Sequence, residues 1–420
     1  MFKSLTFRVL AALVLGLALG ALAKYLANPA LSEAAQIGKA VGGLWLNALK
    51  MTIVPLVLSL LVTGVAGFSD ASATGRLAAR AVGLFVVLVL VGAVYSMAAT
   101  SGLLAIWPVD PASVAQVRAN APPVEGVAAA DITQFLASIS PGNPIKAAAE
   151  DAMLPLVIFA CFLGFAMTRL KPEPRAQLKG VFQALADAMV IVVHWVLLAA
   201  PIGVFGLSLG VGLEVGIGAA GLIAHYIATV IIVQLGIILV PYLLIAVFRR
   251  RLLGRFIAAA APVQAMAIST QSSLACLPAM LDQAKGPLRV PAHVADLLLP
   301  LAVAIFRLTS SVANLAVVFF LVHLYGLHPS LGQMAAAAFV ALAVAVGSVG
   351  LPGQVSFMAS IGPICLTLGV PVELLGVFIA VEVMPDIFRT IGNVTGDLGV
   401  TVLLSDEREA EPDAGMNPAA

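Results

Sequence analysis

Charged residues and cysteines are both scarce in this sequence, and each shortage excludes a class of protein. Asp, Glu, Lys and Arg together make up 10% of the 420 residues, whereas soluble domains carry about 25%. The three cysteines, Cys161, Cys276 and Cys365, lie in apolar surroundings and are odd in number, so a disulfide framework or zinc site is not supported. The five histidines show no metal-ligand spacing. A net charge of +1 gives no reason to expect nucleic acid as a partner.

Hydrophobic residues dominate instead, at 61% of the chain, which predicts a polytopic membrane protein. A helix needs about 20 apolar residues to cross the hydrocarbon. Apolar stretches of this kind lie near residues 7–27, 36–68, 80–107, 131–170, 178–212, 215–248, 291–325 and 369–404. The first could be a secretory signal with Ala-Leu-Ala at 21–23. Because seven further stretches follow, a first anchor helix is the simpler interpretation.

The distribution of Lys and Arg between these stretches predicts the orientation of the chain. Basic residues gather at 3–8, 76–80, 169–179 and 249–255, whereas the alternate loops hold only Lys24, Lys39 and Arg118. We therefore expect a multi-pass protein of the cell (inner) membrane with its N-terminus in the cytoplasm. The acidic tail, residues 405–420, is also expected there and disordered. The Pro-rich stretch 108–130 reads as an extended aqueous loop.

Two stretches are interrupted in the middle and do not read as simple spans. Residues 252–284 are broken by a Ser/Thr/Gln run at 269–273, and residues 331–368 by a Gly/Pro-rich run at 347–354. Each half has about 15 residues, roughly 22 Å of helix, which is too short to cross. We therefore expect two re-entrant hairpins whose tips are covered by protein or a watery cavity. A single interruption is weak evidence, but two hairpins, each followed by a polar span, are typical of the inverted repeats of secondary transporters.

The last apolar stretch carries a stripe of polar side chains. Counted from the first, they are spaced by four, seven, eight, eleven and fifteen residues: Glu382, Asp386, Arg389, Thr390, Asn393 and Asp397. This spacing places them on one face of a helix. Ionisable groups at membrane depth are costly and are kept mainly where they face a cavity or a partner. The stripe therefore predicts a charged pocket for a charged solute; structural ion pairs between helices are the alternative.

Several motifs carry a resemblance to a known family. Asp386 to Asp397 reads D-x-x-R-T-x-x-N-V-x-G-D, the tip of the first hairpin contains Ser272-Ser273 before Leu277-Pro278, and that of the second contains Gly350-Leu351-Pro352-Gly353. In order and spacing, residues 5–404 resemble the dicarboxylate/amino acid:cation symporter family, which includes the glutamate transporters. The resemblance implies an all-α fold of eight transmembrane helices plus two re-entrant hairpins. It also implies inverted repeats, a homotrimer and an elevator mechanism.

The same resemblance implies a division into two units. The scaffold would comprise helices 1 and 2 in residues 1–79 and helices 4 and 5 in residues 131–212. The transport domain would comprise helix 3 in residues 80–107 and all of residues 213–404, with hairpin 1 at 252–284 and hairpin 2 at 331–368. Residues 108–130 would form an extracellular loop and residues 405–420 a disordered cytoplasmic tail.

The family's substrate roles transfer to matching positions. Arg389 would pair with the distal carboxylate of the substrate, because its planar fork suits bidentate capture, and Asp386 would take the α-ammonium. Thr390 and Asn393 would add hydrogen bonds. The α-carboxylate would be held at the hairpin tips, by Ser272, Ser273, Gly350, Pro352 and Gly353. Each tip serine can equally be a helix cap. Members that carry plain dicarboxylates lack an acid at the position of Asp386, so the sequence favours aspartate or glutamate.

The cation-binding motif departs from the family. Its Asn-Met-Asp-Gly-Thr is here Phe-Arg-Leu-Thr-Ser at 306–310, and a Thr and Ser of the third span are Leu88 and Val89. Of those sodium ligands only Asn393 and Asp397 remain. Ser310, the last residue of the altered motif, is a further candidate for this cation site. Our hypothesis is that Arg307 occupies a former cation position and neutralises Asp397 or Asp386, since a buried arginine needs a carboxylate. Alternatively, Arg307 lines the aqueous side and tunes substrate charge.

These features predict a secondary transporter of acidic amino acids with altered or lost sodium coupling, and no cofactor. The coupling ion stays open between sodium, a proton and none, and Glu382 is a candidate proton carrier. One alternative is a sodium- or proton-coupled C4-dicarboxylate symporter, and another is a substrate-gated anion channel. An intramembrane hydrolase using Ser273 is disfavoured because no histidine lies within the hairpins.

Overall fold

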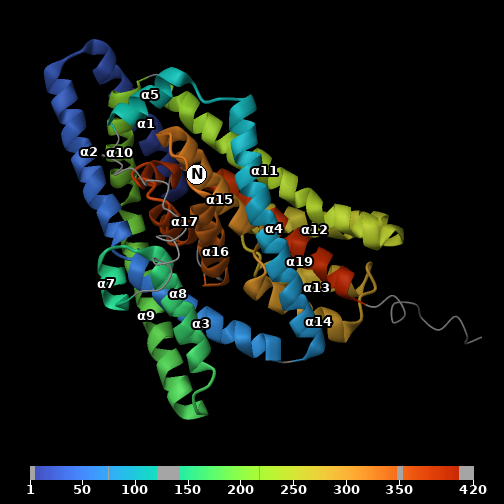
Figure 1. Ribbon diagram of the computed structural model, residues 1–420. Helices are drawn as coiled ribbons and strands as arrows, with labels where there is room; N and C mark the ends of the chain where they lie inside the picture. Colours follow the sequence, from blue (N-terminus) through green and yellow to red (C-terminus); the bar gives the residue numbers. More distant parts are fainter. Residues whose placement is uncertain (1–4, 74, 121–141, 217, 348–352, 406–420) are drawn as a thin grey trace, which may run out of the picture.

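The computed structural model describes residues 5–73, 75–120, 142–216, 218–347 and 353–405, and all regular structure in these ranges is helical (Figure 1). A helix satisfies every backbone group within its own segment, which is what an apolar surrounding demands. Seven helical stretches in these ranges are long and apolar enough to cross a membrane: Phe7–Leu26, Pro29–Ala66, Arg76–Ile106, Pro172–Leu198, Gly218–Phe248, Arg250–Thr270 and Ala292–Tyr325. The expected multi-pass helical protein is confirmed at this level.

Among the described helices of the first half of the chain, four begin at a proline: α2 (Pro29–Lys50), α5 (Pro111–Asn120), α7 (Pro144–Ala149) and α9 (Pro172–Leu198). The others are α1 (Leu5–Leu26), α3 (Ile53–Ala73), α4 (Arg76–Ile106), α8 (Met153–Met167) and α10 (Ala200–Val215). At the start of α2, Asn28 Oδ1 accepts from the backbone N–H groups of Ala30 and Leu31. This cap, with Pro29 in the first turn, fixes the corner between α1 and α2.

The second half of the chain holds the helices around the polar stripe. They are α11 (Gly218–Phe248), the 3₁₀ turn η1 (Arg250–Leu252), α12 (Leu253–Thr270), α13 (Leu277–Lys285), α14 (Ala292–Ile305), α15 (Leu308–Tyr325), α16 (Leu331–Gly347), α17 (Gly353–Thr367), α18 (Leu375–Phe378) and α19 (Val383–Leu404). In α15 every residue except His323 and Tyr325 is buried, as expected of a helix that is apolar on all sides and central in the molecule.

Glycines allow α1, α2 and α10 to pack closely at one side of the molecule, on the left of Figure 1. A Cβ at Gly20 of α1 would lie 2.3 Å from the carbonyl oxygen of Leu209, and one at Gly206 would lie 2.2 Å from that of Gly38. Small residues at such contacts let helix backbones approach each other, which is how helices associate in a membrane. These three helices therefore form one tightly packed group.

Both interrupted stretches fold as pairs of helices in contact. In the first, α12 and α13 pack against each other and are separated by residues 271–276, where Gln271 has the left-handed φ of +49°. Helices α16 and α17 pack against each other and against α15 (Figure 1). The tip between α16 and α17 lies outside the described residues. With 18 residues, α12 is longer than the expected half of about 15, and α13 is shorter, with 9. The re-entrant placement of both pairs stays a prediction.

Two of the polar spans are broken where the stripe residues lie. The seventh expected span divides into α14 and α15, with Phe306 and Arg307 in non-helical conformations between them. The last span divides into α18 and α19, and Glu382 lies in the turn just before α19. Helix breaks leave backbone groups without their regular intrahelical partners. In the turn before α19 several of these groups bond within the turn, such as Val381 N–H to the Phe378 carbonyl oxygen (3.0 Å).

The prediction that residues 108–130 form an extended loop is wrong for Pro111–Asn120. These residues form α5, whose first turn is capped by Asp110: its carboxylate accepts from the Ser113 backbone N–H (2.9 Å) and hydroxyl (2.8 Å). These bonds favour the charged carboxylate and lower the pKa of Asp110. An acidic cap followed by proline is a helix-start signal, and the overall Pro content of the loop concealed it.

Candidate functional site

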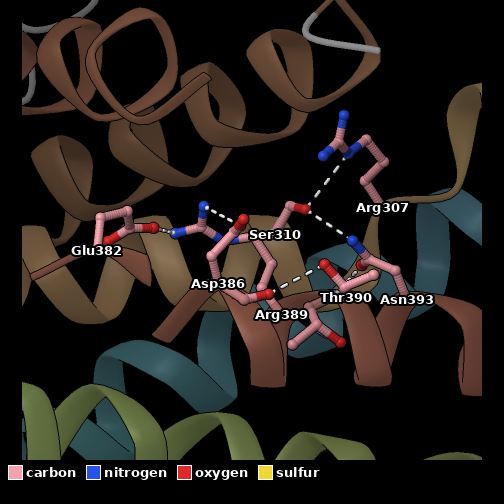
Figure 2. A network of polar contacts seen from close by, with 8 residues as sticks. Arg307, Ser310, Glu382, Asp386, Arg389, Thr390 and Asn393 are labelled. Atoms are coloured by element: carbon pink, nitrogen blue, oxygen red, sulfur yellow. Dashed lines mark hydrogen bonds and ion pairs between the residues drawn. The ribbon is translucent and has the colours of Figure 1, made fainter. Parts of the chain in front are cut away.

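The arginine of the final helix is held between two carboxylates. Arg389 Nη2 lies 2.5 Å from Glu382 Oε1, and Arg389 Nη1 lies 3.2 Å from Asp386 Oδ1. Figure 2 shows the guanidinium between the two acids, one before α19 and one in its first turn. The exposed fractions of the three side chains are 3% for Arg389, 1% for Glu382 and 11% for Asp386. A buried arginine is tolerated only with such partners, so the three residues form one charged unit.

An asparagine joins this unit to α15. Asn393 Oδ1 accepts from the backbone N–H of Thr309 (3.1 Å), and Asn393 Nδ2 donates to Ser310 Oγ (2.9 Å). The Thr309 N–H belongs to the first turn of α15, where no intrahelical acceptor exists, so the asparagine satisfies a group that the helix break leaves open. The Thr390 hydroxyl donates to the Asp386 carbonyl oxygen (3.0 Å) within α19. The predicted substrate ligands of α19 are thus brought together in one place.

The second arginine approaches the same cluster from the break before α15. Arg307 Nε donates to Ser310 Oγ (3.3 Å), so Arg307 and Asn393 meet at the Ser310 hydroxyl (Figure 2). Arg307 also lies within electrostatic reach of Asp386 and Asp397. Its predicted ion pair with one of these two carboxylates stays a prediction.

Asp397 is the most enclosed acid of the cluster. Its exposed fraction is 0%, and neither carboxylate oxygen has a hydrogen-bond partner among the residues that the structure describes. Arg307 lies within electrostatic reach of it. An unpaired buried carboxylate is strongly unfavourable, so Asp397 needs a nearby positive charge, from a side chain or a bound cation, or a proton of its own.

The space next to Gly396, the residue before Asp397, is filled by apolar side chains. Phe306 stacks on Phe85 with ring centroids 4.6 Å apart, and a Cβ at Gly396 would lie 3.2 Å from the Phe306 ring. A cavity of only about 10 Å³ remains there, lined by Leu88, Leu308 and other apolar residues, which is at the lower limit for one water molecule. The residues at the changed positions therefore fill this region and add no side-chain oxygen to it.

The hairpin tips carry the remaining predicted residues. Ser272 and Ser273 lie in the turn between α12 and α13 and are half-buried. Ser272 Oγ accepts from the backbone N–H of Ala275 (3.3 Å), the bond expected if this serine caps the turn. Gly353 is the first residue of α17, and Gly350 and Pro352 lie outside the described residues. Their contact with a substrate stays a prediction.

Two polar groups near the cluster were missed by sequence reasoning. Tyr226 of α11 is fully buried, stacks on Phe378 (3.8 Å between centroids) and lies within electrostatic reach of Glu382 and Arg389. Among the described residues its hydroxyl has no hydrogen-bond partner. A tyrosine in an apolar span gives no sequence signal for such a place, since aromatic residues are common in buried helices.

The second missed group is Gln264 of α12. Its side-chain amide donates to the Tyr242 hydroxyl and the Thr395 hydroxyl, at 2.8 Å in both cases. These bonds tie α12 to α11 and α19 beside the cluster. A glutamine within an apolar half-helix is a usable signal, because a buried amide needs partners.

A bundle of apolar helices that encloses two arginines and three carboxylates beside broken helices defines a multi-pass membrane protein built to handle a charged solute. The chain belongs to the sodium:dicarboxylate symporter family, whose model matches residues 5–407. This confirms the resemblance inferred from the hairpin and final-helix motifs.

Of three curated relatives, two span nearly the whole chain and the third spans about two thirds of it. It is 26% identical over 423 residues to a "Proton/glutamate-aspartate symporter" of Escherichia coli (strain K12), covering 97% of this chain and 93% of that protein. It is 24% identical to a "Proton/sodium-glutamate symport protein" of Bacillus caldotenax, covering 96% and 94%. It is 32% identical over 294 residues to a "C4-dicarboxylate transport protein" of Yersinia enterocolitica, covering 67% and 64%. These relatives are transport proteins, so the protein is a membrane transporter and not an enzyme.

Proposed function

We propose that this protein is a secondary transporter of acidic amino acids, aspartate or glutamate. The observation that carries the proposal is the buried pair of Arg389 and Asp386, 3.2 Å apart and both beside Glu382. An acidic amino acid offers a carboxylate and an ammonium group, which are the two charges that complement this pair. The relatives named as glutamate and aspartate symporters support the same substrate class.

Binding would exchange one internal ion pair for two ion pairs with the substrate. The ammonium group would draw Asp386 away from Arg389, and the distal carboxylate would take the freed Nη1 edge of the guanidinium. A plain dicarboxylate brings no ammonium group, so its binding would leave Asp386 unpaired close to a second negative charge. Specificity would thus include a penalty against the wrong substrate as well as a gain for the right one.

The charge balance supports coupling without sodium. Arg307 brings a fixed positive charge within reach of Asp397 and Asp386, while Phe306 and Leu308 fill the adjacent space. Sodium prefers several hard oxygen ligands, as other hard cations do, and these two side chains supply none. We propose that Arg307 takes the place of a cation and that transport proceeds as exchange, uniport or proton-coupled uptake.

Glu382 is the proposed proton carrier. It faces Arg389 and Asp386, and Tyr226 of α11 lies within electrostatic reach. When a substrate carboxylate reaches Arg389, an ionised Glu382 would place a second buried negative charge on the same guanidinium. A proton on Glu382 removes that repulsion, so the substrate and a proton would move together.

The wider arrangement is proposed as a homotrimer in the cell (inner) membrane with both termini in the cytoplasm. Residues 1–79 and 131–212 would form the scaffold and residues 80–107 and 213–404 the moving unit. The tight packing of α1 and α2 on α10 supports a rigid scaffold. The broken spans around α15 and α19 support a solute site in the moving unit.

Uptake into proteoliposomes tests this proposal. Labelled aspartate, glutamate and succinate would be compared with sodium replaced by choline and with a pH gradient on or off. Saturable uptake of aspartate or glutamate that persists in choline is expected. Uptake that strictly requires sodium would contradict the role of Arg307, and uptake that does not saturate would indicate the anion channel.

A C4-dicarboxylate symporter is the second candidate. The relative from Yersinia enterocolitica, 32% identical over 294 residues, favours it. Preferential uptake of succinate over both amino acids would establish this candidate in place of the first.

A further inference from the structure

A second cluster of basic side chains lines a cavity away from the cluster around Arg389. The cavity has a volume of about 540 Å³ and is lined by residues from α4, α5, α15, the turn after α15 and α16: Ser101, Arg118, Phe319, Val322, His323, Gly326, Leu327, His328, Pro329 and Met334. We call it the Arg118 pocket. None of these lining residues is acidic, and three of them are basic.

Arg118 is positioned by the end of α15. Its Nε donates to the carbonyl oxygen of Leu324 (2.9 Å) and its Nη2 to that of His323 (3.0 Å). The guanidinium lies over Gly326, where a Cβ would be 2.7 Å from Arg118 Cζ. Gly326 also has a φ of +70°, which favours glycine. Two hydrogen bonds therefore hold the guanidinium against the turn, and its close approach requires a glycine at position 326.

Among the described residues, no acid balances the positive charge of Arg118. Within the described part of the chain, no carboxylate lies within ion-pair distance of Arg118, and Nη1 has no acceptor there. The carbonyl groups at the end of α15 offset only part of a unit charge. One edge of the fork thus remains available for an anion.

Two histidines add donors to the same cavity. His323 and His328 are both exposed and lie on either side of the Gly326 turn, and both Arg118 and His328 lie within electrostatic reach of His323. A neutral imidazole still offers one N–H donor, and an anion bound beside it would favour its protonated form. The apolar part of the lining is provided by Phe319, Leu327 and Met334.

We propose that the Arg118 pocket binds a small soluble carboxylate anion, as a second site separate from Arg389. Arg118 Nη1 would donate to the carboxylate, with His323, His328 and Ser101 as further donors, and the carbon chain would rest on the apolar part of the lining. That the anion is a carboxylate rests on the proposed function, because such a solute is the one that the transporter meets at high concentration. A lipid phosphate has similar charge chemistry and is the competing occupant.

Histidine NMR on the full-length protein tests the proposal. The chain has only five histidines, so their ¹³C-labelled ring signals can be assigned by single substitutions. The protein, in phosphatidylcholine nanodiscs, would be titrated with L-aspartate, succinate and, at equal ionic strength, chloride. We expect saturable shifts of the His323 and His328 signals with a carboxylate but not with chloride. They should persist in Arg389→Gln and require at least about tenfold more ligand in Arg118→Gln, the loss expected for one charged hydrogen bond.

Three results would overturn the proposal. Shifts that vanish in Arg389→Gln would be transmitted from the other site. An unchanged affinity in Arg118→Gln would remove the arginine from the site. Shifts produced by phosphatidylglycerol nanodiscs without any carboxylate would make a lipid phosphate the occupant.

A folding control accompanies the arginine variant. The His225 ring stacks on Trp107 at 4.0 Å, so an unchanged His225 signal reports that this region is intact. If Arg118→Gln does not fold, His328→Gln replaces it, with a weaker shift of His323 expected and an unchanged affinity counting against the site. The proposed function is tested by a different result: it fails if no labelled acidic amino acid is taken up. The Arg118 pocket can still be tested in that case, because succinate probes it whichever solute the protein carries.

Discussion

Replacing Asp386 by asparagine is expected to reverse the preference between an acidic amino acid and a plain dicarboxylate. The substitution keeps the size of the side chain and removes its charge. Asp386 lies 3.2 Å from Arg389, which keeps Glu382 at 2.5 Å as its other partner. The arginine therefore stays paired, and the interaction that is lost should be the one between residue 386 and the ammonium group of the substrate.

The expected magnitude follows from the contact that is lost. A hydrogen bond to a charged group contributes about 1.5–3 kcal/mol, which corresponds to roughly 10- to 150-fold in affinity. Aspartate should therefore bind about 10- to 150-fold more weakly. Succinate should bind equally well or better, because a negative charge close to one of its carboxylates has been removed.

Ligand-induced thermal stabilisation of the purified protein measures both affinities, because a ligand that binds only the folded state raises its stability by RT ln(1 + [L]/Kd). Asp187→Asn is a matched control, since Asp187 is exposed on α9 and, among the described residues, accepts a side-chain hydrogen bond from Gln183 alone (3.0 Å). The control should leave both affinities unchanged. An equal loss for aspartate and succinate in Asp386→Asn would refute the assigned role, and so would no loss for aspartate.

Four further substitutions test other parts of the site. Arg389→Ala should abolish uptake and lower the free energy of unfolding by about 3–5 kcal/mol, because it leaves Glu382 buried without its partner; unchanged substrate affinity would mean that the pocket is elsewhere. Glu382→Gln should keep substrate exchange but lose accumulation driven by a pH gradient, whereas wild-type affinity should fall as pH rises and Glu382 loses its proton. Retention of that pH response in the variant would exclude Glu382 as the carrier. Arg307→Met should lose uptake, and sodium should not restore it, because Phe306 still fills the adjacent space; sodium-stimulated recovery would contradict this. Gln264→Leu removes two hydrogen bonds of about 1 kcal/mol each and should lower the thermal midpoint with little change in the aspartate to succinate ratio.

Much of the fold could be predicted because its signals are local. Apolar length identified most of the long helices, and the interruptions at 269–273 and 347–354 lie at or next to the breaks between α12 and α13 and between α16 and α17. Helix α5 was missed because composition averaged over 108–130 outweighed the Asp110 cap. A cap acts on three or four residues, and only position-by-position reading detects it.

The site was predictable in its members but only partly in its contacts. The spacing of the final helix placed Asp386, Arg389 and Asn393 together, and the structure agrees. That Glu382 contacts Arg389 more closely than Asp386 does was not predictable, because it depends on the turn between α18 and α19. The closeness of Tyr226 to this pair required the packing of α11 against α19.

The sequence alone predicted a helical membrane protein, its place in the sodium:dicarboxylate symporter family, and which charged residues share one face of the final helix. The helical class and the charged stripe follow from composition and helical period, which act within one segment, whereas the family follows from the resemblance of the hairpin and final-helix motifs. Only the tertiary structure decided which polar groups meet across breaks and between helices: Arg389 with Glu382, Asn393 with Ser310, and Arg118 with the end of α15. Such contacts require polar atoms of different segments to lie within a few ångströms of each other, and packing sets those distances.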